Sequence, residues 1–332
     1  MKHTLIIAEA GVNHNGRLDL ALELCKAAKE AGADVVKFQT WITEKIITHN
    51  VAQADYQTVN TGKKESQFDM LKKLELSYDD FREIKKYCDE IGIQFASTAD
   101  EKWSLDFLVE LGIPFIKIGS GEVTNIPFLR TMGNKKLPVI ISSGMSSLAD
   151  VDVALRTLRD SGTKNITLLH CITNYPCPMQ EVNLNAMLTL RDAFKVPVGY
   201  SDHTKGIEVP IAAVALGATV IEKHFTLDRN MEGPDHLAST EPAEFKKMVD
   251  AIRNIEVALG SGEKVPTKSE SDISKVVLKR CVAMQEIKAG EVFTDKNLCV
   301  KRNDKGLPAK YWDLIEGKKA TRDYVADEAV EL

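Results

Sequence analysis

The chain lacks the features of membrane, secreted and nucleic-acid-binding proteins. None of its apolar runs approaches the roughly 20 residues that a membrane-spanning helix needs. The stretch Thr4–Ala8 is too short, and too close to Glu9, to form the core of a signal peptide. The 332 residues contain no basic run, and a formal net charge of −5 argues against a general nucleic-acid binder. We therefore expect a soluble, cytoplasmic protein with no membrane or nucleic-acid partner.

Two further absences narrow the class. The six cysteines are scattered without a CxxC pair or a zinc-finger spacing, which indicates reduced side chains rather than a disulfide framework. No GxGxxG or GxxxxGK[ST] motif follows a strand-like run, so a nucleotide-binding fold would have no phosphate loop. Neither a disulfide-stabilised domain nor a dinucleotide-binding domain is favoured.

What the chain does contain is a regular alternation of short β-branched runs and amphipathic helical patterns. The runs are Leu5–Ile7, Val35–Val36, Gln94–Ala96, Phe115–Ile118, Val139–Ile141, Thr167–Leu169, Val196–Val198 and Thr219–Ile221. Eight strand–helix repeats within about 260 residues fit a (β/α)8 TIM barrel better than an open doubly wound sheet. We predict an α/β barrel over residues 1–260.

Three segments stand outside this alternation. The polar stretch from Thr40 to Leu76 is predicted to be an insertion after the second strand, of the kind that often serves as a lid. Residues 261–275, rich in Ser and Lys, are predicted to form a flexible or semi-extended linker. Residues 276–332 have their own β pattern and are predicted to form a small second domain.

Polar residues follow nearly every predicted strand, where the active sites of such barrels lie. The candidates on this rim are Glu9, Lys37, Gln39, Thr98, Lys117, Ser120, Glu122, Ser142, Tyr175 and Ser201. Taken singly, each has an ordinary explanation, such as a helix cap at Ser142 or a structural turn at Tyr175. Together, two lysines, several hydroxyls and glycine-flanked amides suit a phosphorylated, carboxylated anion.

A histidine lies just beyond each of the last two strands, at His203 and His224. In a parallel barrel both emerge on the same rim, one strand apart. Two imidazoles with an open position between them suit a borderline divalent metal that must also bind substrate. The turn Gly233–His236 can bring the carboxylate of Asp235 back over this rim.

Several of these segments closely resemble the N-acetylneuraminate (sialic acid) synthase family, which includes the legionaminic and pseudaminic acid synthases. The segments are Ala8–Gly16, Val36–Thr40, Lys117–Glu122, Leu169–Cys171, Tyr200–Thr204, Glu222–Thr226 and Gly233–Asp235. The tail from Val282 to Arg302, with Ile287–Glu291, resembles the antifreeze-like (SAF) domain of that family. The resemblance covers the whole chain.

The resemblance implies condensation of phosphoenolpyruvate with a mannosamine-type aldose to give a nine-carbon 2-keto acid and phosphate. It assigns Mn²⁺ or a similar ion to His203 and His224, and a domain-swapped homodimer in which the partner's Arg302 meets the sugar's N-acyl group. The implied catalytic residues are Glu9, near the metal, with Glu122 and Asp235. Phosphoenolpyruvate is assigned to Lys37, Thr98, Lys117, Ser120, Ser142 and Ser201. The sugar is assigned to Gln39, Glu122, Tyr175 and Asp235.

Two departures and two alternatives accompany this assignment. Thr173 stands where some members of the family have asparagine, and Arg302 precedes Asn303-Asp304 rather than Pro-Gly. The alternatives are a related synthase that makes an eight- or seven-carbon keto acid, and a non-catalytic carbohydrate-binding protein of the same fold. The sugar itself stays open between N-acetylmannosamine, its 6-phosphate and 2,4-diacetamido-2,4,6-trideoxymannose.

Overall fold

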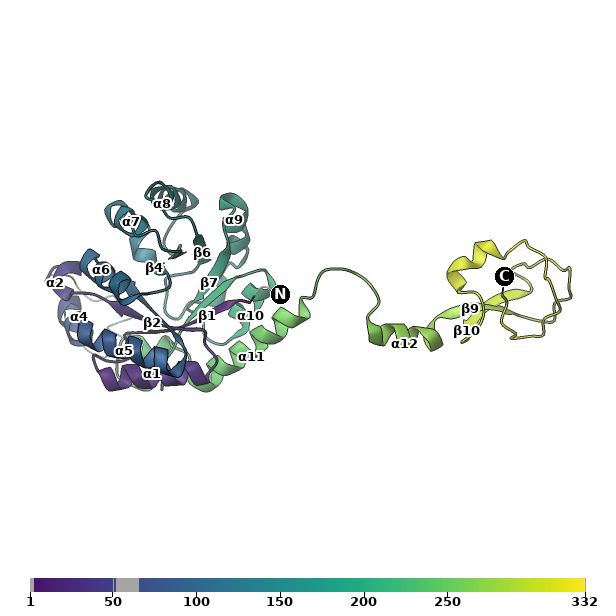
Figure 1. Cartoon of the computed structure of the whole chain (residues 1–332), viewed down its shortest axis with the longest axis horizontal. Coiled ribbons are helices and arrows are strands. Elements are labelled where there is room, and N and C mark those ends of the chain that lie inside the picture. The colour runs from purple at the N-terminus through teal and green to yellow at the C-terminus, as the bar shows by residue number, and fades with distance from the viewer. Residues whose placement is uncertain (1–2, 50, 52–65, 332) are drawn as a thin grey trace. The chain divides into compact units, whose positions relative to one another are not determined.

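The computed structural model describes residues 3–49, 51 and 66–331 (Figure 1). The chain divides into two compact units, one ending at Gly260 and the other beginning at Ser261, and each has its own hydrophobic core. Within the described ranges, no helix combines the length and apolar character required to cross a bilayer.

Eight parallel strands close the first unit into a barrel in which β1 pairs with both β2 and β8. The strands are β1 (Leu5–Gly11), β2 (Val35–Thr40), β3 (Gln94–Ala99), β4 (Ile116–Ile118), β5 (Val139–Ser142), β6 (Ile166–His170), β7 (Val198–Asp202) and β8 (Val220–His224). Each of the eight predicted runs overlaps one of these strands. The predicted TIM barrel is confirmed.

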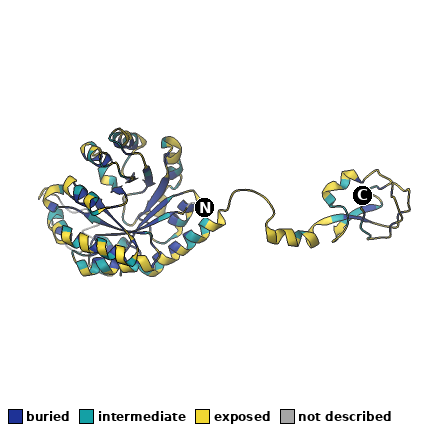
Figure 2. Cartoon of the chain, viewed as in Figure 1, coloured by how far each residue is buried: buried dark blue, intermediate teal, exposed yellow. Residues whose placement is uncertain are grey.

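Helices cover the outside of the barrel and bury their apolar stripes against the strands (Figure 2). They are α1 (Leu18–Glu30), α5 (Tyr78–Ile91), α6 (Lys102–Leu111), α7 (Ile126–Gly133), α8 (Leu148–Asp160), α9 (Asn185–Phe194), α10 (Glu208–Ala215) and α11 (Pro242–Ala258). Helices α2 (Thr43–Ile46) and α4 (Gln67–Leu74) pack instead in a separate cluster with Val12 and Trp41. Capping boxes begin α5 at Ser77 and α8 at Ser147, so the sequence itself fixes where these helices start.

The interior of the barrel is filled by a second apolar cluster that is separate from the strand–helix core. It consists of Leu5, Ile7, Val35, Ala96, Phe115, Ile140, Leu169 and Val220. Packing is tight enough that a Cβ atom on Gly199 of β7 would overlap the Val220 carbonyl oxygen and lie 2.6 Å from Leu169 Cδ2. This layer closes the lower barrel and leaves the carboxyl ends of the strands for the site.

The second unit is built on two antiparallel strands, β9 (Lys279–Ala283) and β10 (Leu298–Arg302). Its core includes Cys281, Ile287, Phe293 and Tyr324, and the 3-10 segment η4 (Ala309–Leu314) completes it. Before it, helix α12 (Lys268–Val277) begins at a capping box on Thr267. The second half of the predicted linker 261–275 is therefore helical, because that cap and helix-forming residues outweigh its polar composition.

Candidate active site

The functional side chains continue the inward-facing rows of the barrel. Successive side chains of a strand point to opposite faces, so a residue two positions after the apolar layer also faces inward. The residues at that spacing are Glu9, Lys37, Thr98, Lys117, Ser142, Cys171, Ser201 and Glu222. All of them line a cavity of about 260 Å³ at the carboxyl ends of the strands.

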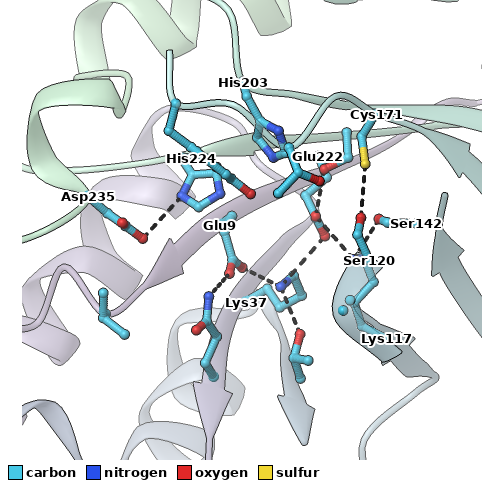
Figure 3. Close-up of a pocket in the computed structure, with 18 of the residues that line it drawn as sticks. Glu9, Lys37, Lys117, Ser120, Ser142, Cys171, His203, Glu222, His224 and Asp235 are labelled. Atoms are coloured by element: carbon cyan, nitrogen blue, oxygen red, sulfur yellow. Dashed lines mark hydrogen bonds and ion pairs between the residues drawn. The ribbon is translucent and has the colours of Figure 1, made fainter. Parts of the chain in front are cut away.

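Four charged side chains from four strands form a buried ion network at the floor of this cavity (Figure 3). Lys37 Nζ lies 2.6 Å from Glu9 Oε2 and 3.7 Å from Glu222 Oε2, and Lys117 Nζ lies 3.3 Å from Glu222 Oε1. Side-chain exposure is at most 5% in all four, so solvent screens these charges little. The network holds two cations within reach of one ligand.

The pKa values of the two carboxylates of the network are shifted in opposite directions. Burial raises the pKa of Glu9 to about 7, and Lys37 offsets only part of this effect. Burial acts in the same direction on Glu222, but the ammonium groups of Lys117 and Lys37 outweigh it and lower the pKa to about 2. Near neutral pH, Glu222 is a fixed anion and Glu9 can take up or release a proton.

Hydroxyl groups surround the two ammonium groups. Lys37 Nζ donates to Thr98 Oγ1 at 3.0 Å, and Lys117 Nζ donates to Ser142 Oγ at 2.9 Å. Ser120 Oγ accepts from the Gly144 N–H at 3.1 Å. A side chain at Gly144 would meet Ser120 Oγ and overlap the Thr173 hydroxyl, which shows how closely the chain approaches here. Cations and hydroxyl donors converging on one space suit an anionic ligand.

The two histidines meet on the opposite side of the cavity. The rings of His203 and His224 have centroids 5.3 Å apart, and the Tyr175 ring packs 4.1 Å from His203. His203 Nδ1 lies 2.6 Å from the Ile172 carbonyl oxygen. Because only a protonated Nδ1 can make that bond, its Nε2 carries a lone pair. Burial lowers the pKa of both imidazoles, which keeps them neutral as metal ligation requires.

These donors fit a divalent ion that keeps positions for other ligands. No cluster of three or more His, Cys, Asp or Glu side chains placed to hold a metal occurs in residues 3–49, 51 and 66–331. Asp235 is the nearby carboxylate, with Oδ2 3.8 Å from His224 Nδ1, and burial raises its pKa to about 6. Two neutral imidazoles leave the remaining positions of an ion open to water or substrate.

The loop after β1 holds the turn that carries Asp235 in place through hydrogen bonds. Asn15 Nδ2 donates to the Glu232 carbonyl oxygen at 2.8 Å, and its Oδ1 lies 3.2 Å from His236 Nε2. At Gly233, whose φ is 157°, a Cβ atom would stand 2.6 Å from the His236 ring and 2.8 Å from Asn15 Oδ1. Glycine is therefore required where the chain turns back over the rim.

One predicted site residue of the barrel unit does not line this cavity. The Glu122 carboxylate accepts from Asn125 Nδ2 at 2.6 Å within its own turn and does not line the cavity. Arg302 is exposed on β10 of the second unit, where its cross-strand partner is Lys279. Of the predicted lid 40–76, residues 50 and 52–65 lie outside the described residues.

Sequence reasoning missed several lining residues. Glu222 lies two residues after Val220 and two before His224. The two-residue period of the strand therefore predicts that its side chain faces inward. Asp100 follows β3, and burial, with Glu122 adding to it, raises its pKa to about 7. Thr173, set aside as a departure, also lines the cavity.

An apolar wall on one side of the cavity was also missed. Met70, Leu71 and Leu74 of α4 line it together with Val12 of the loop after β1. They belong to a small separate cluster that includes Trp41. The insertion is predicted to be of a kind that serves as a lid, but its sequence spacing does not identify which side chains reach the cavity.

Comparison with known proteins gives matches along nearly the whole chain. The NeuB family profile matches residues 24–264, and the SAF domain profile matches residues 281–331. The N,N'-diacetyllegionaminic acid synthase of Campylobacter jejuni is 48% identical over 99% of both chains. The synthase of the same name from Legionella pneumophila is 46% identical over 97% of this chain and 91% of its own.

Solved structures agree with the sequence matches. The N-acetylneuraminic acid synthetase of Leptospira borgpetersenii, crystallised with citrate, superposes with a TM-score of 0.71. It is 34% identical, and the match covers 82% of this chain and 90% of the Leptospira chain.

Proposed function

The chain belongs to the NeuB family, with a C-terminal SAF domain, and on that premise we propose that it is a nonulosonate synthase. It condenses phosphoenolpyruvate with a mannosamine-type aldose to give a nine-carbon 2-keto sugar acid and inorganic phosphate. The observation that carries the proposal is the cavity in which Lys37 and Lys117 stand opposite His203 and His224.

We assign phosphoenolpyruvate to the space around the two lysines. Its phosphate and carboxylate carry the negative charge that Lys37 and Lys117 attract, and Thr98, Ser120 and Ser142 supply hydroxyl donors around them. Holding this weak carbon nucleophile against an aldehyde is mostly a positioning effect. C3 then bonds to the aldehyde carbon through the C2–C3 π electrons, and C2 becomes electron-poor. The carbonyl π electrons of the aldehyde move to its oxygen, which takes up a proton from solvent and becomes a hydroxyl.

Glu9 is placed to complete the reaction. A pKa of about 7 allows its carboxylate to accept a proton from the water that adds to C2. The tetrahedral carbon formed in this way then collapses, the C2–O bond to phosphate breaks, and the 2-keto group forms. Glu222 stays ionised beside both lysines and keeps their charges fixed while phosphate leaves.

We assign a divalent ion, Mn²⁺ or one of similar character, to His203 and His224. Such an ion polarises the aldehyde carbonyl as a Lewis acid when it is bound. The Ile172 carbonyl orients the His203 ring for that task, and Tyr175 packs over it. Asp235, beside His224, meets the hydroxyl groups of the sugar.

The apolar wall favours one of the three candidate sugars. It offers the side chains of Val12, Met70, Leu71 and Leu74 to the far end of the aldose, and none of these four can pair with a hydroxyl or a phosphate. A 6-deoxy sugar places a methyl group there instead. This agrees with the C. jejuni and L. pneumophila relatives, so we propose 2,4-diacetamido-2,4,6-trideoxymannose as the substrate.

The rival functions have less support. A seven- or eight-carbon product would need a four- or five-carbon aldose, whereas the relatives named above are nonulosonate synthases. A non-catalytic carbohydrate-binding protein has no need of a buried network of four charges beside two neutral imidazoles. We place the protein in the cytoplasm, a location supported by six cysteines that are all unbridged.

Turnover of phosphoenolpyruvate tests the function directly. Phosphate release should require both phosphoenolpyruvate and a mannosamine-type aldose, and Lys117→Ala should weaken phosphoenolpyruvate binding by about 1.5–3 kcal/mol, roughly ten- to a hundredfold. Lys205→Ala, an exposed lysine outside the cavity, is the matched control. Unchanged phosphoenolpyruvate affinity in Lys117→Ala would contradict the assignment, and turnover of only four- or five-carbon aldoses would favour the rival synthase.

Steady-state kinetics on the three candidate aldoses test the apolar wall. We expect the highest kcat/KM with the 2,4-diacetamido-trideoxy sugar, because a buried methyl group is worth about 0.8 kcal/mol and an unpaired hydroxyl opposes binding. Leu71→Asn should reduce that preference several-fold at constant phosphoenolpyruvate KM, whereas Leu71→Met should keep it. A preference that is the same in all three proteins would show that the wall does not select the sugar.

Metal removal tests the histidine pair. Chelation should abolish turnover, added Mn²⁺ should restore it, and His203→Ala or His224→Ala should stay inactive with unchanged circular dichroism. His3→Ala, an exposed histidine near the amino-terminal ends of the strands, should behave as wild type. An enzyme that stays active after exhaustive chelation would exclude the proposed ion.

We further propose a domain-swapped homodimer in which Arg302 of one subunit serves the active site of the other. Support comes from its exposure at the end of β10 beside Lys279, where the paired strands bring two cations together. A guanidinium group binds an N-acyl oxygen well, and closed two-fold dimers are the commonest assembly.

Subunit mixing tests the shared site. Arg302→Ala and His203→Ala proteins should each be inactive alone, and mixed heterodimers should recover one complete site and therefore part of the activity. Native mass spectrometry confirms that subunits have exchanged. Exchanged mixtures that remain inactive would contradict the shared site.

A further inference from the structure

A second buried charge pair lies immediately behind the two histidines, on the outer face of the barrel wall. Asp202 and Lys223 are cross-strand partners on β7 and β8, one residue before His203 and one before His224. Their neighbours Ser201 and Glu222 line the cavity, so alternation turns Asp202 and Lys223 away from it. Side-chain exposure is 2% for Lys223 and 0% for Asp202.

The contacts of this pair bracket His203 on both sides. Lys223 Nζ lies 2.5 Å from Oδ2 of Asp202, the residue before His203. It also donates to the carbonyl oxygen of Thr204, the residue after His203, at 2.9 Å. Asp202 Oδ1 also accepts from the Thr204 N–H at 3.0 Å and from its hydroxyl at 2.8 Å. The backbone of His203 is thus tied to the strand that carries His224.

A pair of this kind is weak evidence for stability. Desolvation offsets the attraction of buried opposite charges, so apolar residues of similar volume are often equally stabilising. The pair does fix the separation of the two strands, because each buried charge is stable only when it is close to its partner on the other strand. Neither side chain reaches the cavity, so the reaction itself does not use them.

We propose that Asp202, Lys223 and Thr204 form a clamp of positioning residues that sets the distance between His203 and His224 and thereby the affinity for the divalent ion. The inference rests on the proposed metal-dependent function. Groups behind metal-binding histidines commonly change metal affinity by about 10–100-fold when they are removed. This clamp acts through the backbone rather than through a bond to either ring.

The test measures Mn²⁺ binding to the folded, metal-stripped full chain by electron paramagnetic resonance. The double variant Asp202→Asn/Lys223→Met removes the ion pair while keeping an acceptor for Thr204. We expect about tenfold weaker Mn²⁺ binding, with turnover recovering at saturating Mn²⁺, which a general loss of stability would not give. Arg253→Met is the matched control, because its bonds to Asp34 at 2.8 Å and Glu256 at 2.9 Å tie the opposite end of the barrel.

Each result has a separate meaning. Wild-type protein that binds no Mn²⁺ would refute the proposed metal-dependent function, and the clamp proposal would fall with it. A double variant whose Mn²⁺ affinity stays within twofold of wild type would overturn the clamp alone. If the double variant does not fold, Thr204→Val removes one bond to Asp202, and we expect a smaller loss in the same direction. Unchanged affinity in Thr204→Val would then overturn the proposal.

Discussion

The burial of four charges in one layer of a closed barrel is the constraint on which the rest of this structure depends. Glu9, Lys37, Lys117 and Glu222 come from four strands, and none is stable in the interior without the others. Only a closed barrel brings all four strands to one point. The apolar layer beneath them keeps the local dielectric constant low, so their mutual attraction stays strong.

The protein separates two electrostatic tasks by the face of the strand that it uses. Inward positions carry the charges that line the cavity, and outward positions of the last two strands carry a pair that contacts only protein. Glu222 of the inward set and the pair Asp202–Lys223 occupy neighbouring positions of β7 and β8, with the histidines just beyond. Neighbouring residues therefore serve binding and geometry without competing for the same space.

Much of the barrel and its inner row could be predicted, because both follow from the two-residue period. Lys37, Lys117 and Ser142 follow buried apolar positions by two residues, so a correct strand assignment places them without any knowledge of contacts. Loop residues carry no such period. The Glu122 carboxylate could point into the cavity or bond to Asn125 within its own turn. Side-chain packing decides between these two orientations, and the local sequence does not encode that choice. The apolar wall needed a tertiary contact between α4 and the loop after β1.

Closure of β1 against β8 also has a consequence for how the site is formed in time. Glu9 pairs with His224, so residues from the first and last strands of the barrel must meet before the ion network exists. Contacts between such distant parts of a chain form late and slowly, because loop closure must be paid for in entropy first. A nascent or partly folded chain therefore holds no working fragment of this site, and the capacity to bind its ligands appears only when the last strand has docked.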